Sequence, residues 1–303
     1  MSLGSVLTTV RSGAGSVRSV LAIERLRSNP LGTAKLTAKY TVAVLISLWM
    51  LFPIYWMFVT GIQPRATIQN WPPQFLFFAP TFEHYVALFL QEGYHLFLFN
   101  SLIVSATAVA ISLALAIPAA YSLSRMNVPG GHHFAFYILS TRMVPPLAIL
   151  VPLFVFYQDL GLSNSRPGLI IVHLLLTLPL MIWIIKGFID DIPVSLEESA
   201  MVGGCTRMQA FREVTLPLIA PGVGAAAFIG FIFSWNDFQM ALVLVDGTRR
   251  TAPLAVQATM GYLEIKWGQL GAAGTVTVLP VILLSLAIRD YLVAGMTMGA
   301  VKE

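Results

Sequence analysis

A small set of polar side chains lies inside otherwise apolar runs of this chain, and these residues are the first candidates for chemistry. Arg142 and Asp237 are ionisable, which is costly inside a bilayer and by default indicates a function. Small-molecule sites combine aromatic side chains with a few well-placed polar groups. We therefore expect a polar path for a hydroxylated solute, with five candidate residues: Asn100, Arg142, Trp235, Asn236 and Asp237.

A purely structural role for the same residues is the alternative. Arg142 would then pair with Asp237 or with backbone carbonyls, and Asn100 would cap or bridge helices. His173 is expected to be a satisfied interior histidine rather than a ligand. The spacing of a catalytic triad or of a metal site is not evident, so no catalytic and no metal-ligating residue is predicted. The chain also lacks a G-x-x-x-x-G-K-S/T phosphate loop, so any ATP would bind another chain.

The composition places these residues in a membrane protein. The chain of 303 residues is 57% hydrophobic and 11% charged, with a mean hydropathy of +0.78. A soluble domain carries about 25% charged residues, so the bilayer is the natural solvent for the apolar surplus. Cys205 is the single cysteine, and no internal disulfide can form.

The basic residues are concentrated before the first long apolar run, in residues 1–37 and at Lys39. A basic arm could bind nucleic acid, but the positive-inside rule explains the cluster better. We therefore expect 1–37 to be a cytoplasmic tail, 38–303 to be a transmembrane domain, and no nucleic acid to be bound. The distribution of Lys and Arg among the loops predicts that both termini are cytoplasmic.

The sequence predicts an all-α integral membrane protein with six transmembrane helices. A spanning helix needs about 20 mostly apolar residues, and six runs of that kind occur. They are Tyr40 to Ile62, Leu96 to Leu123, Phe134 to Tyr157, Pro167 to Phe188, Leu218 to Val245 and Leu270 to Tyr291.

The connection between the fourth and fifth runs, residues 189–217, is long and carries its own helix signals. Ser195 with Glu198, and Thr206 with Gln209, have the spacing of two capping boxes. A glycine pair, 203–204, separates them and is suited to the left-handed turn that ends a helix. We expect two short helices, Leu196 to Val202 and Arg207 to Leu216, which project from the cytoplasmic face as a stiff lever.

This connection resembles the EAA loop of ABC import permeases, the segment that docks in a cleft of the ATPase subunit. The family pattern is roughly E-A-A-x-x-x-G, then nine residues, then I-x-L-P. Ser199, Gly203 and Val214 depart from the pattern. The residues that the resemblance assigns to ATPase coupling are Glu198, Ser199, Ala200, Gly204, Phe211, Leu216 and Pro217.

The resemblance extends over nearly the whole chain after residue 37. The order of its segments is similar to the maltose-type carbohydrate permeases, and in particular to the shorter of their two paired subunits. The stretch SWNDF, Ser234 to Phe238, resembles an element of the fifth helix in that group. The ending GMTMGAVKE, Gly295 to Glu303, resembles the tail that reaches toward the ATPases.

The resemblance implies a type I ABC importer fold and a permease subunit for a sugar or polyol in the bacterial plasma (inner) membrane. It further implies a second permease subunit, two ATP-binding subunits and an extracytoplasmic solute-binding protein as partners, within membrane lipid. ATP and Mg²⁺ would be bound by the partner ATPase, so this chain itself would bind no cofactor and would not be an enzyme.

Two other functions remain open on the sequence alone. An ion-coupled secondary transporter could use Arg142 and Asp237 as a charge relay, although the inverted repeats common in that class are not evident. A membrane-bound enzyme would need clustered acidic or histidine residues at a membrane edge, and these are scarce.

Overall fold

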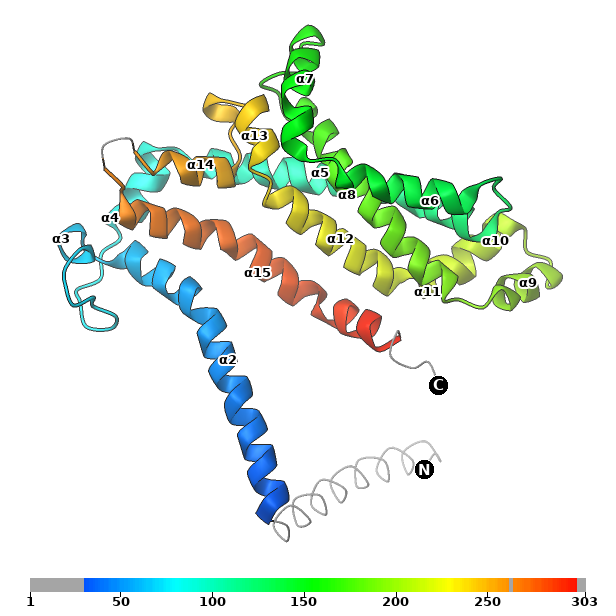
Figure 1. Ribbon diagram of the computed structural model, residues 1–303, viewed down its shortest axis with the longest axis horizontal. Coiled ribbons are helices and arrows are strands. Elements are labelled where there is room, and N and C mark those ends of the chain that lie inside the picture. Colours follow the sequence, from blue (N-terminus) through cyan, green and yellow to red (C-terminus); the bar gives the residue numbers. More distant parts are fainter. Residues whose placement is uncertain (1–29, 262–263, 299–303) are drawn as a thin grey trace, which may run out of the picture. The chain divides into compact units, whose positions relative to one another are not determined.

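The computed structural model describes residues 30–261 and 264–298, and within these ranges the chain is built of helices with no β-strand (Figure 1). Most of the predicted basic tail, and the last five residues of the ending that resembles the permease tail, lie outside the described residues. Internal contacts divide the chain into two compact units, residues 1–56 and 57–303. The functional site lies in the second unit.

Four helices are each long and apolar enough to cross a membrane, and they confirm the first, second, fourth and sixth predicted spans. Further short helices occupy the connections: α3 Arg65–Ile68, α4 Glu83–Val86, the π-helix η1 Ala87–Gln91, the 3-10 helix η4 Gly247–Arg249 and α14 Ala252–Ala258. The four long helices are α2 Pro30–Ile62, α5 Tyr94–Arg125, α8 Arg166–Asp190 and α15 Trp267–Met298.

The third predicted span is broken. It consists of α6 Gly131–Ser140, a 3-10 turn η2 Thr141–Met143, and α7 Pro146–Asp159, with a bend of 87° between the two parts. The physical reason is the pair Pro145 and Pro146, because proline lacks the N–H that continues a helix and disfavours the α conformation of the residue before it. The continuous helix predicted from Phe134 to Tyr157 is therefore wrong.

The fifth span is also interrupted. The helix α12 Ala220–Trp235 ends before Asn236, and a separate short helix, α13 Gln239–Leu244, follows it. A bend of 68° separates α12 from the helical segment Arg207–Leu218 that precedes it. The single helix predicted from Leu218 to Val245 is thus two helices with a break at residues 236–238.

The helices α5, α8 and α12 pack against one another in the second unit, and α15 packs on α12. Figure 1 shows α5, α8, α12 and α15 running lengthwise beside one another. Ala116 and Ala120 of α5 are fully buried in the same core as Ile185 of α8, because small side chains allow two membrane helices to approach closely. Any shift of one of these helices must therefore be accommodated by its neighbours.

The first turn of α8 is closed by Ser165. Its hydroxyl donates to the carbonyl of Leu162 (2.6 Å) and accepts from the N–H of Gly168 (3.1 Å). Gly168 is pressed against that same carbonyl, so a Cβ added there would clash with backbone that cannot move aside. At Gly187, in the last turn of the same helix, an added Cβ would meet nothing within 4 Å.

We predict that Gly168→Ala destabilises the protein by about 1–3 kcal/mol, the usual range for overpacking. The matched variant Gly187→Ala should be neutral or stabilising by about 0.5–1 kcal/mol, because glycine weakens a helix interior relative to alanine. The measurement is the midpoint of thermal unfolding of both purified variants in detergent. Equal midpoints for the two variants would show that the start of α8 is not closely packed.

Candidate functional site

The connection between α8 and α12 forms the two-helix unit that the sequence predicts. The first helix is α9 Val194–Val202, and the second segment runs through α10 Arg207–Ala210, a π-turn η3 Phe211–Thr215 and α11 Leu216–Leu218. Gly204 has a φ of +99°, a backbone conformation that favours glycine. We call residues 194–218 the coupling loop.

One of the two predicted capping boxes is confirmed. Gln209 donates its N–H to the Thr206 hydroxyl (3.3 Å) and accepts from the Thr206 N–H through its side-chain oxygen (2.7 Å). The box predicted for Ser195 and Glu198 is wrong. Pro193 stands at the N-cap and the helix begins at Val194, so Ser195 is already inside α9 and no side chain caps its start.

The predicted position of Pro217 is also wrong, because Pro217 lies within α11 rather than after the second helix. Proline offers no N–H to the carbonyl of Glu213, four residues earlier. The preceding residues widen into the π-turn Phe211–Thr215, which keeps the chain helical up to the proline.

The coupling-loop residues divide into an outward and an inward set. Glu198, Ser199, Gly204 and Pro217 are exposed. Ala200, Phe211 and Leu216 are half-buried, and the Phe211 ring packs on Tyr121 of α5 with a centroid distance of 4.6 Å. The loop thus has one face against the helices and one face open.

A buried acid that the sequence analysis missed ties the inward face to the helices. Glu197 is 4% exposed and accepts hydrogen bonds from the Arg125 Nε and the Tyr121 hydroxyl, both at 2.8 Å. Burial alone would raise the pKa of Glu197, but the hydrogen bonds from Arg125 and Tyr121 and the charge of Arg125 hold its pKa below the ordinary value. The carboxyl is therefore ionised at neutral pH.

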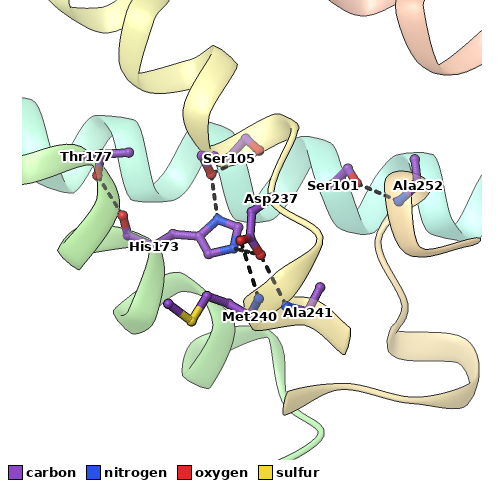
Figure 2. A network of polar contacts seen from close by, with 9 residues as sticks. Ser101, Ser105, His173, Thr177, Asp237, Met240, Ala241 and Ala252 are labelled. Carbon is purple, nitrogen blue, oxygen red and sulfur yellow. Dashed lines mark hydrogen bonds and ion pairs between the residues drawn. The ribbon is translucent and has the colours of Figure 1, made fainter. Parts of the chain in front are cut away.

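A second constellation lies at the break of the fifth span, where Figure 2 shows His173 between two polar partners. Its Nδ1 is 2.6 Å from the Ser234 hydroxyl, which in turn donates to Ser105 of α5 (3.1 Å). Its Nε2 is 3.3 Å from an Asp237 carboxylate oxygen. The network joins α5, α8, α12 and Asp237, which lies two residues before α13. His173 is an interior histidine, as predicted, but only its Nδ1 is hydrogen-bonded, and Nε2 approaches the carboxylate without a hydrogen bond.

Ser234, His173 and Asp237 have the residue types of a nucleophilic triad, although their sequence spacing does not indicate one. The geometry is that of a packing element. Ser234 and His173 are 2% and 1% exposed, and a buried serine is inaccessible to a substrate. Asp237 also accepts from the N–H groups of Met240 (3.4 Å) and Ala241 (3.1 Å) at the start of α13. The carboxylate therefore holds the new helix in place after the break.

Asn100 and Trp235, two of the predicted path residues, are likewise buried with protein partners. The Asn100 amide donates to the carbonyls of Thr248 (2.8 Å) and Arg250 (2.9 Å), and its oxygen accepts from Arg166 Nε (2.9 Å). The Trp235 indole donates to the carbonyl of Thr277 in α15 (3.2 Å). These contacts agree with the bridging role that the sequence left open for Asn100.

Arg142 and Asn236 are placed differently. Arg142 lies at the break of the third span with its guanidinium 4.4 Å from the centroid of the Phe233 ring, and its Nη1 has no hydrogen-bond partner. Asn236 is exposed beside the break of the fifth span. Asp237 lies beside His173, and Arg142 stacks on an aromatic ring. Arg142 and Asp237 therefore do not form the ion pair that the sequence analysis gave as the structural alternative.

Two hollows open among the loops at the Tyr94 end of α5. The larger, about 830 Å³, is lined by residues of α7, α13 and α14 and includes Phe154, Gln158, Asn164 and Gln257. The smaller, about 280 Å³, lies beside Arg65 and Glu264. In the described part of the chain, no group of three or more His, Cys, Asp or Glu residues is arranged to hold a metal ion.

A family model described as "Binding-protein-dependent transport system inner membrane component" matches residues 112–298. These residues include the coupling loop and both broken spans. The match also covers Arg142, His173, Ser234 and Asp237, whereas Ser105 of the same network lies before it.

The match with curated relatives extends over nearly their whole length. The diacetylchitobiose uptake system permease protein DasC of Streptomyces coelicolor is 34% identical over 261 residues, which is 86% of this chain and 95% of the relative. The trehalose transport system permease protein SugB of Mycobacterium tuberculosis is 32% identical over 275 residues, 90% of this chain and 100% of the relative.

The fold also matches solved structures. A bacterial ABC transporter involved in the import of the acidic polysaccharide alginate has a chain that superposes with a TM-score of 0.71 at 22% identity, covering 84% of this chain and 95% of that one. A second structure, of the alginate transporter with a periplasmic protein bound to an alginate pentasaccharide, gives 0.60 at 17% identity and covers 88% and 94%. The expected all-α importer fold is thereby confirmed.

We predict that Asp237→Ala lowers the free energy of unfolding by about 1–3 kcal/mol, because it leaves buried N–H groups of α13 unpaired. Asp237→Asn should cost less, since its amide oxygen can still accept from them. The exposed neighbour provides the control, and Asn236→Ala should stay within about 0.5 kcal/mol of the parent. Thermal unfolding in detergent measures all three; a harmless Asp237→Ala would contradict the capping role.

Proposed function

Since this chain belongs to the family of binding-protein-dependent transport system inner membrane components, we propose that it is a permease subunit of an ATP-driven ABC importer for a sugar or polyol. The observation that carries the proposal is the open face of the coupling loop. It exposes large apolar side chains: Val202, at 90%, lies at the end of α9 between the fourth and fifth spans, and Met208, at 59%, lies in the short helical segment before the 68° bend. An exposed apolar patch of that kind marks a docking surface.

The proposed partner at this surface is a separate ATP-binding subunit, which holds the nucleotide and Mg²⁺. Glu198 and Gly204 stand on the open face, where the family resemblance places the contact. A nucleotide can shift a conformational equilibrium only through a difference in affinity between the two states. Here the two states that differ in nucleotide affinity would be those of a pair of ATPases. The coupling loop would transmit their conformational change to the membrane helices.

The substrate class rests on the relatives, which are named as permeases for diacetylchitobiose and trehalose. We propose a sugar or polyol delivered by an extracytoplasmic solute-binding protein, with a second permease subunit that completes the pore. The chain is a multi-pass membrane protein. The excess of basic residues in the tail supports a bacterial inner-membrane orientation with both termini in the cytoplasm.

For the path of the solute, we propose that Arg142 and Asn236 contact it, while Asn100, Trp235 and Asp237 shape the wall behind them. The Arg142 Nη1 is buried and has no hydrogen-bond partner, so a sugar hydroxyl that reaches it when the path opens could accept from it. The Phe233 ring beside it offers an apolar face. The larger hollow, with Phe154 and three amide side chains, provides an entrance of similar chemistry.

We predict that Glu198→Lys and Gly204→Asp each abolish ATP-driven uptake while the protein still inserts. The first reverses a charge on the docking face, and the second forces a side chain into the positive-φ turn. Uptake of labelled sugar by membrane vesicles that hold the complete transporter measures the effect, with insertion checked by immunoblot. Asp159→Lys makes the same charge change at an exposed residue of α7, far from the loop in sequence, and should transport normally. Normal uptake by both loop variants would rule out docking at this face.

A second prediction concerns Arg142. Arg142→Ala should lower the maximal rate of sugar uptake by roughly tenfold, because a hydrogen bond to a charged donor contributes about 1.5 kcal/mol. The half-saturating sugar concentration, which the binding protein sets, should change little. Arg249→Ala, an exposed arginine of the outer loops, is the control. An unchanged maximal rate for Arg142→Ala would remove Arg142 from the path.

A further inference from the structure

The buried ion pair between Arg125 and Glu197 joins three helices at one point. Arg125 ends α5, and its side chain is 7% exposed. Its Nε donates to Glu197 of α9, and its Nη2 donates to the carbonyls of Ile189 (2.8 Å) and Ile192 (2.6 Å) at the end of α8. The last carbonyls of a helix lack a regular partner within it. Arg125 adds a donor to the Ile189 carbonyl, which also accepts from the N–H of Ile192 (3.1 Å), and donates to the Ile192 carbonyl just after α8 ends.

A pair buried this deeply is stable only when its remaining hydrogen-bonding groups are also satisfied. Here both carboxylate oxygens of Glu197 accept a hydrogen bond, one from Arg125 and one from Tyr121. The Tyr121 ring packs on Phe211, so α5 contacts both halves of the coupling loop. Loss of one charge would leave the other buried without a partner, which is strongly destabilising for the local arrangement.

The far end of α5 carries a matching set of contacts. Asn100 donates to the carbonyls of Thr248 and Arg250 in the loop that holds η4. Ser101 accepts from the N–H of Ala252 at the start of α14 (2.8 Å), as Figure 2 shows. A helix of 32 residues is about 48 Å long, so α5 connects the coupling loop to the loops at the opposite end of the bundle.

We propose that Arg125 and Glu197 are positioning residues for transport, which clamp the coupling loop to α5 and α8 so that the loop and both helices move together. This inference rests on the proposed function, because it assumes that an ATPase displaces the loop. The displacement would then reach the opposite end through α5 and its contacts at Asn100 and Ser101. A loop attached only through its chain ends could pivot instead and lose that motion.

The first test measures sugar uptake and ATP hydrolysis in the same vesicles, which contain the full transporter and its binding protein. Glu197→Gln should lower the number of sugars transported per ATP by roughly 2- to 30-fold, the range expected for a coupling residue. Hydrolysis itself should persist. Asp159→Asn, which neutralises an exposed acid of α7 outside the coupling loop, should keep the parent ratio.

A second test follows the loop directly. Spin labels at Ser195→Cys in α9 and Met126→Cys after α5, both exposed positions, are placed in a Cys205→Ser background whose uptake is measured first. The distance between the labels should be the same without nucleotide and with ATP trapped. Adding Glu197→Gln should broaden the distribution in both states.

Three results would overturn the clamp. They are an unchanged ratio of sugar to ATP in Glu197→Gln, a label distance that differs between the two nucleotide states of the parent, and loss of the ATPases from purified Glu197→Gln. The last result would mean that the pair serves only the fold of the docking face. Uptake by the parent transporter is measured before any variant is compared. If the parent shows no ATP-driven uptake, the proposed function is wrong, independently of the clamp.

Discussion

The constraint on which this structure depends is that a polar group inside a bilayer must find its partner within the protein. Several places where a membrane helix is interrupted or ends carry such a solution. Asp237 accepts from N–H groups in the first turn of α13 after the fifth span breaks, and Arg125 donates to the carbonyls of Ile189 and Ile192 where α8 ends. Asn100 does the same for the carbonyls of Thr248 and Arg250. The polar residues that first suggested chemistry therefore serve largely to let the helices stop and turn.

The sequence predicts the features that depend on neighbouring residues. The apolar runs locate the long helices, Thr206 and Gln209 form their capping box three residues apart, and Gly204 takes the positive φ of the turn. Patterns of neighbouring residues do not predict contacts between residues that are far apart in the sequence. The partner of His173 is Asp237, 64 positions away, and Glu197 bonds to Arg125, 72 positions away. The capping box predicted for Ser195 does not form, because α9 begins at Val194 with Pro193 at its N-cap. The sequence pattern therefore identified the helix correctly but placed its first residue too late.

A signal for Glu197 was nevertheless present. Positions 197, 200 and 201 share one face of a helix, and Ala200 and Met201 indicate that this face is at least partly buried. An acid on a buried face requires a basic or hydroxyl partner. Arg125, a basic residue two positions after the second predicted span, is at the matching depth. Adjacent helix residues point about 100° apart, so Glu197 faces the helices while Glu198 faces outward, and two neighbouring acids acquire different roles.

This separation of roles bears on how force could pass through the subunit. A docking face must be exposed to meet its partner, whereas a clamp must be buried so that water does not weaken its ion pair. The coupling loop meets both needs within one turn of α9, because the side chains of Glu197 and Glu198 lie on opposite sides of the boundary between protein and solvent. The exposed Glu198 is adjacent to Glu197, which bonds directly to Arg125 of α5, so few flexible residues lie between the docking face and that helix. Closely packed elements have few intermediate arrangements, so a displacement at the loop would be carried along α5 rather than absorbed where it begins.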